Sequence, residues 1–221
     1  MKELTTESIN NLLDIKESYK ASDKLMSIIF CKEKREKMFK SFLEQNWDMS
    51  FDWFHIYFQD EHADRKSKKQ DFTPKSVSSV LVKILSSDSD NGIRLDVAAG
   101  TGGITIEKWQ QDRINTPFFE YKPSMFIYQC EELSDRALPF LLFNLAIRGI
   151  NAFVLHGDVL SREFKQVYFI QNDNDDMMHF SSINIMPHSK MVEEEFDVRD
   201  WIEEEIKHVE SPVFEFVKGV M

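Results

Sequence analysis

The stretch Asp96-Val97-Ala98-Ala99-Gly100-Thr101-Gly102-Gly103 decides the fold that this chain is expected to adopt. It follows the short apolar run Ile93-Arg94-Leu95 and precedes a helix-like segment, residues 104–109. A strand that ends in a glycine-rich turn and opens into a helix is typical of nucleotide sites, because glycines let the backbone approach a ligand and the helix N-terminus offers free N–H groups. Thr105 stands where a dinucleotide loop has its third glycine, which argues against a dinucleotide ligand. The alternative is an ordinary glycine turn between a strand and a helix.

Composition and charge exclude several classes of protein. The 221 residues include 42% hydrophobic residues and few glycines or prolines, which is typical of a packed domain and not of a disordered chain. The apolar runs are too short to cross a bilayer, and the first residues have no signal-peptide pattern, so we expect a cytoplasmic protein without membrane contact. Two cysteines, Cys31 and Cys130, form neither a disulfide framework nor a metal pattern, and no metal is expected.

The net charge of −11 lies entirely in residues 76–221, whereas residues 1–75 balance. Proteins that hold DNA alone usually have a basic face. The one dense basic run contains Arg65, Lys66, Lys68 and Lys69, and it is the expected point of any DNA contact. A solvated loop is an equally good interpretation of that run. We therefore expect weak DNA binding by the chain alone.

The chain divides into a helical N-terminal region, residues 1–70, and an α/β domain, residues 71–221. Apolar spacing predicts one long amphipathic helix from Ser22 or Asp23 to Phe42, and it predicts that the aromatic residues of 51–58 pack in a core. From Ile93 onward, strand-like runs (93–97, 125–130, 152–155) alternate with helix-like runs (104–113, 134–148), which favours a parallel sheet with crossover helices. Residues 167–170 and 183–186 suggest a hairpin, residues 203–205 a solvated acidic helix, and residues 213–217 a last strand.

Three further pieces follow the order that a nucleotide-type site needs. Glu131 ends the second predicted strand, where a carboxylate can accept hydrogen bonds from ribose hydroxyls. Gly157-Asp158 follows the third strand and can meet an adenine edge. Upstream, Phe72-Thr73-Pro74 opens a helix, with Thr73 as the N-cap and Pro74 at the first helical position. Each piece is a common turn feature by itself, but the ordered set is specific.

With these residues, the chain resembles the N6-adenine DNA methyltransferases, in particular the modification subunits of type I restriction systems. The resemblance covers about residues 50–160 and includes 70–74, 96–103, Glu131 with 144–149, and 157–160. It implies a doubly wound, mostly parallel sheet of the S-adenosylmethionine-dependent methyltransferase type. It also implies that S-adenosylmethionine binds at the carboxyl ends of the strands. The cofactor contacts that it implies are Phe72, Thr73, Pro74, Asp96, Ala98, Gly100, Thr101, Gly102, Glu131 and Asp158.

The resemblance fails at the catalytic loop. The family carries Asn-Pro-Pro-Tyr or Asn-Pro-Pro-Phe there, to accept the adenine amino group and stack on the flipped base. This chain contains neither Asn-Pro-Pro nor Asp-Pro-Pro. The best positional counterpart is Met186-Pro187-His188-Ser189, with Asn184 just before it as a further candidate.

These observations leave three functions open. The first is adenine-N6 methylation of DNA from S-adenosylmethionine. The second is a non-catalytic cofactor-binding protein that acts through a protein partner or as a homo-oligomer, in a restriction-modification or anti-restriction role. The third is a methyltransferase of a non-DNA substrate, since target choice depends on the divergent C-terminal part.

Overall fold

The computed structural model describes residues 4–58 and 93–212. The N-terminal region holds α1 (Thr6–Leu13), the 3-10 turn η1 (Ser18–Lys20), α2 (Ala21–Ile29) and α3 (Lys32–Gln45). The remaining elements are β1 (Arg94–Val97), α6 (Gly103–Asn115), η2 (Pro123–Met125), β2 (Ile127–Glu132), α7 (Leu138–Ile147), β3 (Asn151–Asp158), β4 (Glu163–Gln171), β5 (Ser182–Ile185), α8 (Lys190–Phe196) and β6 (Asp200–Trp201). Mixed α/β architecture, expected from the alternating pattern, is confirmed.

The six strands form one sheet in the order β1-β2-β3-β4-β5, with β6 beside β4. The pairs β1–β2, β2–β3 and β4–β6 are parallel, whereas β3–β4 and β4–β5 are antiparallel. The predicted hairpin is therefore confirmed as β4–β5. Within the described residues the strand order proceeds in one direction from β1 and does not reverse, so this part of the sheet does not display the doubly wound arrangement.

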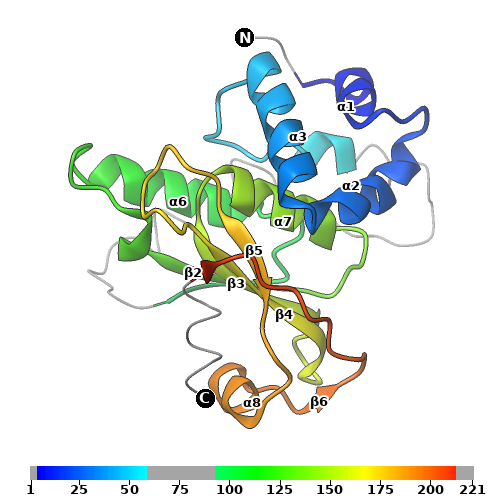
Figure 1. Cartoon of the computed structure of the whole chain (residues 1–221), viewed down its shortest axis with the longest axis vertical. Coiled ribbons are helices and arrows are strands. Elements are labelled where there is room, and N and C mark those ends of the chain that lie inside the picture. The colour runs from blue at the N-terminus through cyan, green and yellow to red at the C-terminus, as the bar shows by residue number, and fades with distance from the viewer. Residues whose placement is uncertain (1–3, 59–92, 213–221) are drawn as a thin grey trace.

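Helix α7 forms the centre of the packing, since every one of its residues is buried. Figure 1 shows α7 between the sheet and the N-terminal helices, with α8 and β6 at the far end of the molecule. An apolar helix of this kind needs contacts all round, which the sheet supplies on one side and α2 and α3 on the other. One continuous core thus joins the N-terminal region to the sheet across the predicted boundary at residue 70.

The aromatic residues between 51 and 58 lie in this core, as predicted. Trp53, Phe54, Tyr57 and Phe58 are buried. Phe54 contacts the rings of Phe140 and Phe143 on α7 at centroid distances of 4.9 and 5.3 Å. These side chains therefore serve helix packing.

Two sequence-based helix predictions are wrong. The long helix from residue 22 to 42 is two helices, because Cys31 is extended (φ −111°, ψ 96°) and separates α2 from α3. The acidic run 203–205 is not helical: Glu203 forms a bend, and the Glu204 carbonyl accepts from the Gln166 side chain of β4 at 2.7 Å. The expected strand at 213–217 lies outside the described residues.

The two faces of the sheet have different covers. Val154 and Tyr168 face α7 in the main core, whereas Leu155 and Val167, one residue along in the strands, face α8 in a second apolar cluster. At β1 the corresponding outward side chains, Leu95 and Val97, are 57% and 47% exposed, and Ile93, just before the strand, is 50% exposed. The part of the chain that the structure describes thus covers this face at β3 and β4 but leaves it exposed at β1. No helix among those residues is long and apolar enough to cross a membrane.

Candidate functional site

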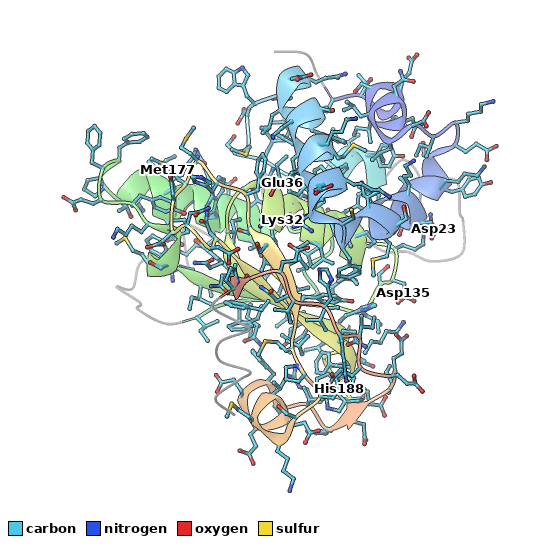
Figure 2. All side chains as sticks on the ribbon, viewed as in Figure 1. Asp23, Lys32, Glu36, Asp135, Met177 and His188 are labelled. Carbon is cyan, nitrogen blue, oxygen red and sulfur yellow. The ribbon has the colours of Figure 1, made fainter. Side chains whose placement is uncertain are left out.

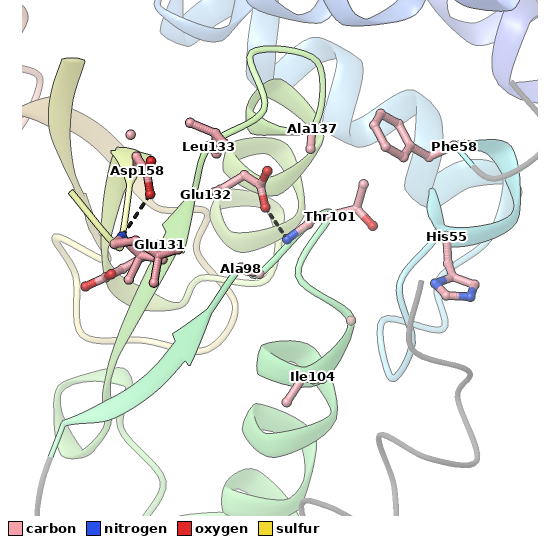
Figure 3. Close-up of a pocket in the computed structure, with 16 residues that line it drawn as sticks. His55, Phe58, Ala98, Thr101, Ile104, Glu131, Glu132, Leu133, Ala137 and Asp158 are labelled. Carbon is pink, nitrogen blue, oxygen red and sulfur yellow. Dashed lines mark hydrogen bonds between the residues drawn. The ribbon is translucent and has the colours of Figure 1, made fainter. Parts of the chain in front are cut away.

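A cavity of about 380 Å³ lies where β1, β2 and β3 end. Parallel strands end at the same edge of a sheet, which is where α/β folds place their ligands. The lining comes from the loops after these strands and from the segment before residue 59: His55, Phe58, Ala98, Ala99, Gly100, Thr101, Gly103, Ile104, Glu131, Glu132, Leu133, Ala137, Gly157, Asp158, Val159 and Leu160. Figure 3 shows the labelled members of this set around the cavity.

The glycine loop has the backbone geometry that its sequence requires. Gly100 and Gly102 adopt left-handed conformations, with φ values of 60° and 96°. A Cβ atom at position 102 would also lie 2.9 Å from a methyl carbon of Leu141 on α7. Ala98 is left-handed as well (φ 63°), which no sequence signal indicated. The first residues of α6, Gly103 and Ile104, line the cavity, so the helix N-terminus lies beside it.

Asp96 lies near the end of β1, before the glycine loop, and is not among the cavity-lining residues. Its carboxylate accepts a hydrogen bond from the Thr105 hydroxyl at 2.6 Å, and burial raises the pKa of this carboxyl. The same hydroxyl lies 3.3 Å from the Cys130 sulfur on β2. Thr105 therefore ties β1, β2 and α6 together, which explains a hydroxyl-bearing residue at a position where a dinucleotide loop has glycine.

Two neighbouring carboxylates at the end of β2 face opposite sides of the sheet. Glu131 is the residue that the sequence analysis expects to accept hydrogen bonds from ribose hydroxyls. In the structure its Oε2 pairs with Arg162 at 2.8 Å, and its Oε1 accepts from Gln129 Nε2 at 3.0 Å. Glu132 lies on the α6–α7 side, in phase with Cys130. Its Oε2 accepts from the Gly100 N–H at 2.6 Å. Figure 3 shows Glu132 reaching toward the glycine loop, with Glu131 on the other side of the strand.

Glu132 is a cavity-lining residue that the sequence analysis did not name. The strand periodicity held a signal, because residues 128, 130 and 132 lie on the face of the sheet that Asp96 shares. Its second oxygen accepts from the Ser134 N–H at 2.7 Å. Burial raises the pKa of the Glu132 carboxyl. Among the described residues, no ion pair balances the charge of Glu132, whereas Arg162 balances that of Glu131.

Asp158 lies at the cavity wall, where the third strand ends. Its Oδ1 accepts from the Leu160 N–H at 2.8 Å, which holds the loop after β3 in a tight turn. Gly157 sits in a bulge against β4, where a Cβ atom would lie 2.2 Å from the Glu163 carbonyl oxygen. The pair Gly157-Asp158 is thus fixed by close backbone packing.

A polar network from the N-terminal region meets the glycine loop. Asp52 accepts a hydrogen bond from the Thr101 hydroxyl, and Asn144 on α7 donates to both Asp52 Oδ1 and the Thr101 carbonyl, each at 2.8 Å. Arg148 donates to the Asn144 side chain at 2.8 Å. Sequence patterns gave no indication that Asp52 belongs to this site.

The predicted catalytic segment is elsewhere in the sheet. Asp96 aligns through β2, β3 and β4 with Ile185 in the register Asp96↔Cys130↔Val154↔Tyr168↔Ile185. Four inter-strand spacings of about 4.8 Å place the two ends roughly 19 Å apart. The structure does not bring residues 186–189 to the cavity.

Side chains of that segment have structural partners. His188 stacks on Trp201 with ring centroids 3.7 Å apart, and Figure 2 shows it close to α8 and β6. Ser189 is the N-cap of α8. Met186 packs against the cluster under α8, and Pro187 precedes the cap.

Asn184 is fully buried. Its Oδ1 accepts from the N–H groups of Glu210 and Ser211, and its Nδ2 donates to the Ser211 hydroxyl at 2.8 Å. All of its amide atoms thus bind the C-terminal segment, so the side chain is engaged away from the cavity.

Several predicted residues fall outside the described part of the chain. These are Phe72, Thr73 and Pro74, and the basic residues Arg65, Lys66, Lys68 and Lys69. Among the described residues, no group of three or more His, Cys, Asp or Glu side chains could hold a metal ion.

Comparison with known proteins gives one family. The family model described as N-6 DNA Methylase matches residues 50–205, a range that contains the glycine loop, both glutamates of β2 and the turn after β3. No curated protein and no solved structure matches the chain.

Proposed function

Because the chain belongs to the N-6 DNA methylase family, we propose that it binds S-adenosylmethionine in the cavity at the ends of β1, β2 and β3. The observation that carries this proposal is the convergence of the left-handed glycine loop, the Glu132 carboxylate and the Gly157-Asp158 turn on one cavity. Its volume of about 380 Å³ falls in the range of small-molecule pockets, roughly 300–1,000 Å³.

Each wall of the cavity offers chemistry that suits one part of the cofactor. Glu132 is placed to accept hydrogen bonds from ribose hydroxyls, as the strand-end acid does in dinucleotide folds. Asp158 and its turn suit the adenine edge, and the glycine loop before α6 allows close backbone approach. The bound cofactor would supply an activated methyl group on a sulfonium centre.

Methyl transfer to adenine needs a second set of groups near that methyl. A flipped base must be held by hydrogen bonding and stacking, and the amino nitrogen must be in line with the methyl–sulfur bond. The segment 186–189 follows β5, which is separated from β1 by three strands, and its side chains contact α8 and β6 instead of lining the cavity. We therefore propose that methylation requires groups from another polypeptide.

The exposed side of β1 supports the involvement of a partner. β1 pairs with β2 alone among the described strands, and its outward side chains Leu95 and Val97, with Ile93 just before them, are about half exposed. The opposite edge of the sheet, β5, is covered by the C-terminal segment, where the His208 carbonyl accepts a hydrogen bond from the Ile185 N–H at 2.8 Å. Half-exposed apolar side chains along a strand form a surface that suits a protein partner. A homo-oligomer is the other way to cover it.

A second function is a cofactor-binding protein that never transfers methyl groups and acts through its partner in a restriction-modification or anti-restriction role. The engagement of residues 184–189 in structural contacts favours it. A methyltransferase of a non-DNA substrate is the third. The basic run 65–69 is the proposed but weak DNA contact, and a cytoplasmic location remains part of the proposal.

Calorimetric titration with S-adenosylmethionine and with its demethylated product tests the cofactor proposal, with NAD as the control ligand. We expect binding of the first two and none of NAD. A tritiated-methyl transfer assay on mixed-sequence DNA, with and without extract of the host cell, separates the two functions. Incorporation that appears only with extract supports methylation with a partner, whereas robust incorporation by the purified chain would show that no partner is needed.

A further inference from the structure

We infer that Asp52, from the N-terminal region, is a positioning residue for the glycine loop and hence for the proposed cofactor. Asp52 lies 49 positions before Thr101 in the sequence, yet its Oδ2 accepts the hydrogen bond of the Thr101 hydroxyl. Its Oδ1 accepts from Asn144 Nδ2 at 2.8 Å and from the Phe54 N–H at 2.9 Å. Both carboxylate oxygens are thus used, one of them directly on the loop. This inference rests on the cofactor site proposed above.

Thr101 is held at two points. Its hydroxyl is fixed by Asp52, and its carbonyl accepts from Asn144 Nδ2 at 2.8 Å. It stands between Gly100 and Gly102, both left-handed, and glycine backbones sample many conformations unless neighbouring contacts restrict them. The hydrogen bonds of Thr101 to Asp52 and Asn144 therefore restrict the conformation of this loop.

The network continues to the backbone that carries Asp52. Arg148 donates to the Asn144 side chain at 2.8 Å, to the Met49 carbonyl at 2.9 Å and to the Phe51 carbonyl at 2.6 Å. Thr101, Asn144 and Arg148 are almost fully buried. Burial raises the pKa of the Asp52 carboxyl and lowers that of Arg148 to about 9. A buried polar network of this kind, with its hydrogen bonds satisfied, fixes one arrangement of the groups that it joins.

The N-terminal region therefore helps to form the cofactor site, because its Asp52 binds the hydroxyl of the cavity-lining Thr101. Gly100, at one end of the loop, also donates to Glu132, the proposed ribose acceptor. A loop released from Asp52 would move the partner of that carboxylate and the first turn of α6. We expect a loose loop to lower cofactor affinity while the sheet and core remain folded.

Two sets of variants test this. Asp52→Ala and Thr101→Val each remove one half of the contact, and each is expected to weaken binding of the demethylated cofactor about tenfold. Thr101→Ser keeps the hydroxyl, and Asp52→Asn keeps an acceptor for Asn144 and can donate to the Thr101 oxygen, so both should retain most of the affinity. Asp23→Ala, on the exposed surface of α2, is the matched control and should bind like wild type. The double variant should be no worse than the single ones, because coupled residues give non-additive effects.

Amide hydrogen exchange in the ligand-free protein keeps this test separate from the cofactor proposal. We expect Asp52→Ala and Thr101→Val to accelerate exchange at Gly100 and Gly102 by at least tenfold, with exchange in β3 unchanged. Unchanged exchange at the loop, or additive effects of the two substitutions on affinity, would overturn the positioning role. If the wild type binds no cofactor, the proposed function fails, and the exchange data still decide whether Asp52 holds the loop.

Discussion

The two adjacent glutamates of β2 give the sharpest prediction about the cofactor site. Glu132 faces the glycine loop, while Glu131 is paired with Arg162 at 2.8 Å. Glu132→Gln removes the charge and one of two acceptor oxygens, both of which now bind backbone N–H groups. Hydrogen bonds to a charged group contribute about 1.5–3 kcal/mol each. Loss of one such bond to the ribose corresponds to roughly 10- to 150-fold weaker binding, at about 1.4 kcal/mol per tenfold.

Glu131→Gln is the matched control, with the same substitution one residue away. Its carboxylate is engaged by Arg162 and Gln129, so we expect less than about threefold change in affinity. We also expect a loss of thermal stability, because the half-buried Arg162 then keeps only the exposed Asp197 as a counter-ion among the described residues. Calorimetric titration with the demethylated cofactor and thermal unfolding measure the two effects. A larger affinity loss in Glu131→Gln than in Glu132→Gln would refute the assignment.

Two further predictions concern stability and the predicted catalytic segment. Burial acts to raise the pKa of Glu210, but the hydrogen bonds and charge of Arg35 outweigh burial, so the pKa in the folded protein is lowered. The carboxylate therefore stabilises the fold fully above its unfolded pKa of about 4.3. That contribution is lost as the pH falls through the lower, folded pKa. We expect Glu210→Gln to cost about 3–5 kcal/mol in urea unfolding at pH 7 and to flatten the acid dependence of the free energy of unfolding; an unchanged dependence would contradict this. His188→Ala should leave cofactor affinity unchanged and lower stability, because the ring stacks on Trp201 far from the cavity; a clear loss of affinity in titration would place the segment at the site after all.

The sequence was most informative where local chemistry determines local structure. Gly100 and Gly102 indicated a glycine-rich turn after the first strand, and the structure has a turn there with both residues in the left-handed conformation. The alternation of strand-like and helix-like runs correctly predicted β1, β2 and β3 with α6 and α7 between them, because each run carries its own periodicity. The break at Cys31 was missed, since the apolar spacing continues across it.

Contacts between distant segments could not be predicted in the same way. Asp52 reaches Thr101 through the packing of the N-terminal region on α7, and no local pattern records that approach. Arg162 and Glu131 are also far apart in the sequence, and only the pairing of the strands brings them together. Strand alternation alone separates the two glutamates of β2, because it places Glu132 on the face of Cys130 and Glu131 on the other face, although both line the cavity. The non-helical backbone of residues 203–205 is held by a hydrogen bond to the Gln166 side chain of β4, which an acidic run in the sequence does not reveal.

Hydrogen-exchange mass spectrometry with and without the demethylated cofactor tests the central claim most directly, since it reports both whether the ligand binds and where. We predict slower exchange on binding in peptides covering residues 96–106, 131–137 and 157–160, with no change in residues 182–201. Protection confined to residues 182–201, or no protection anywhere at saturating ligand, would contradict a cofactor site at the glycine loop.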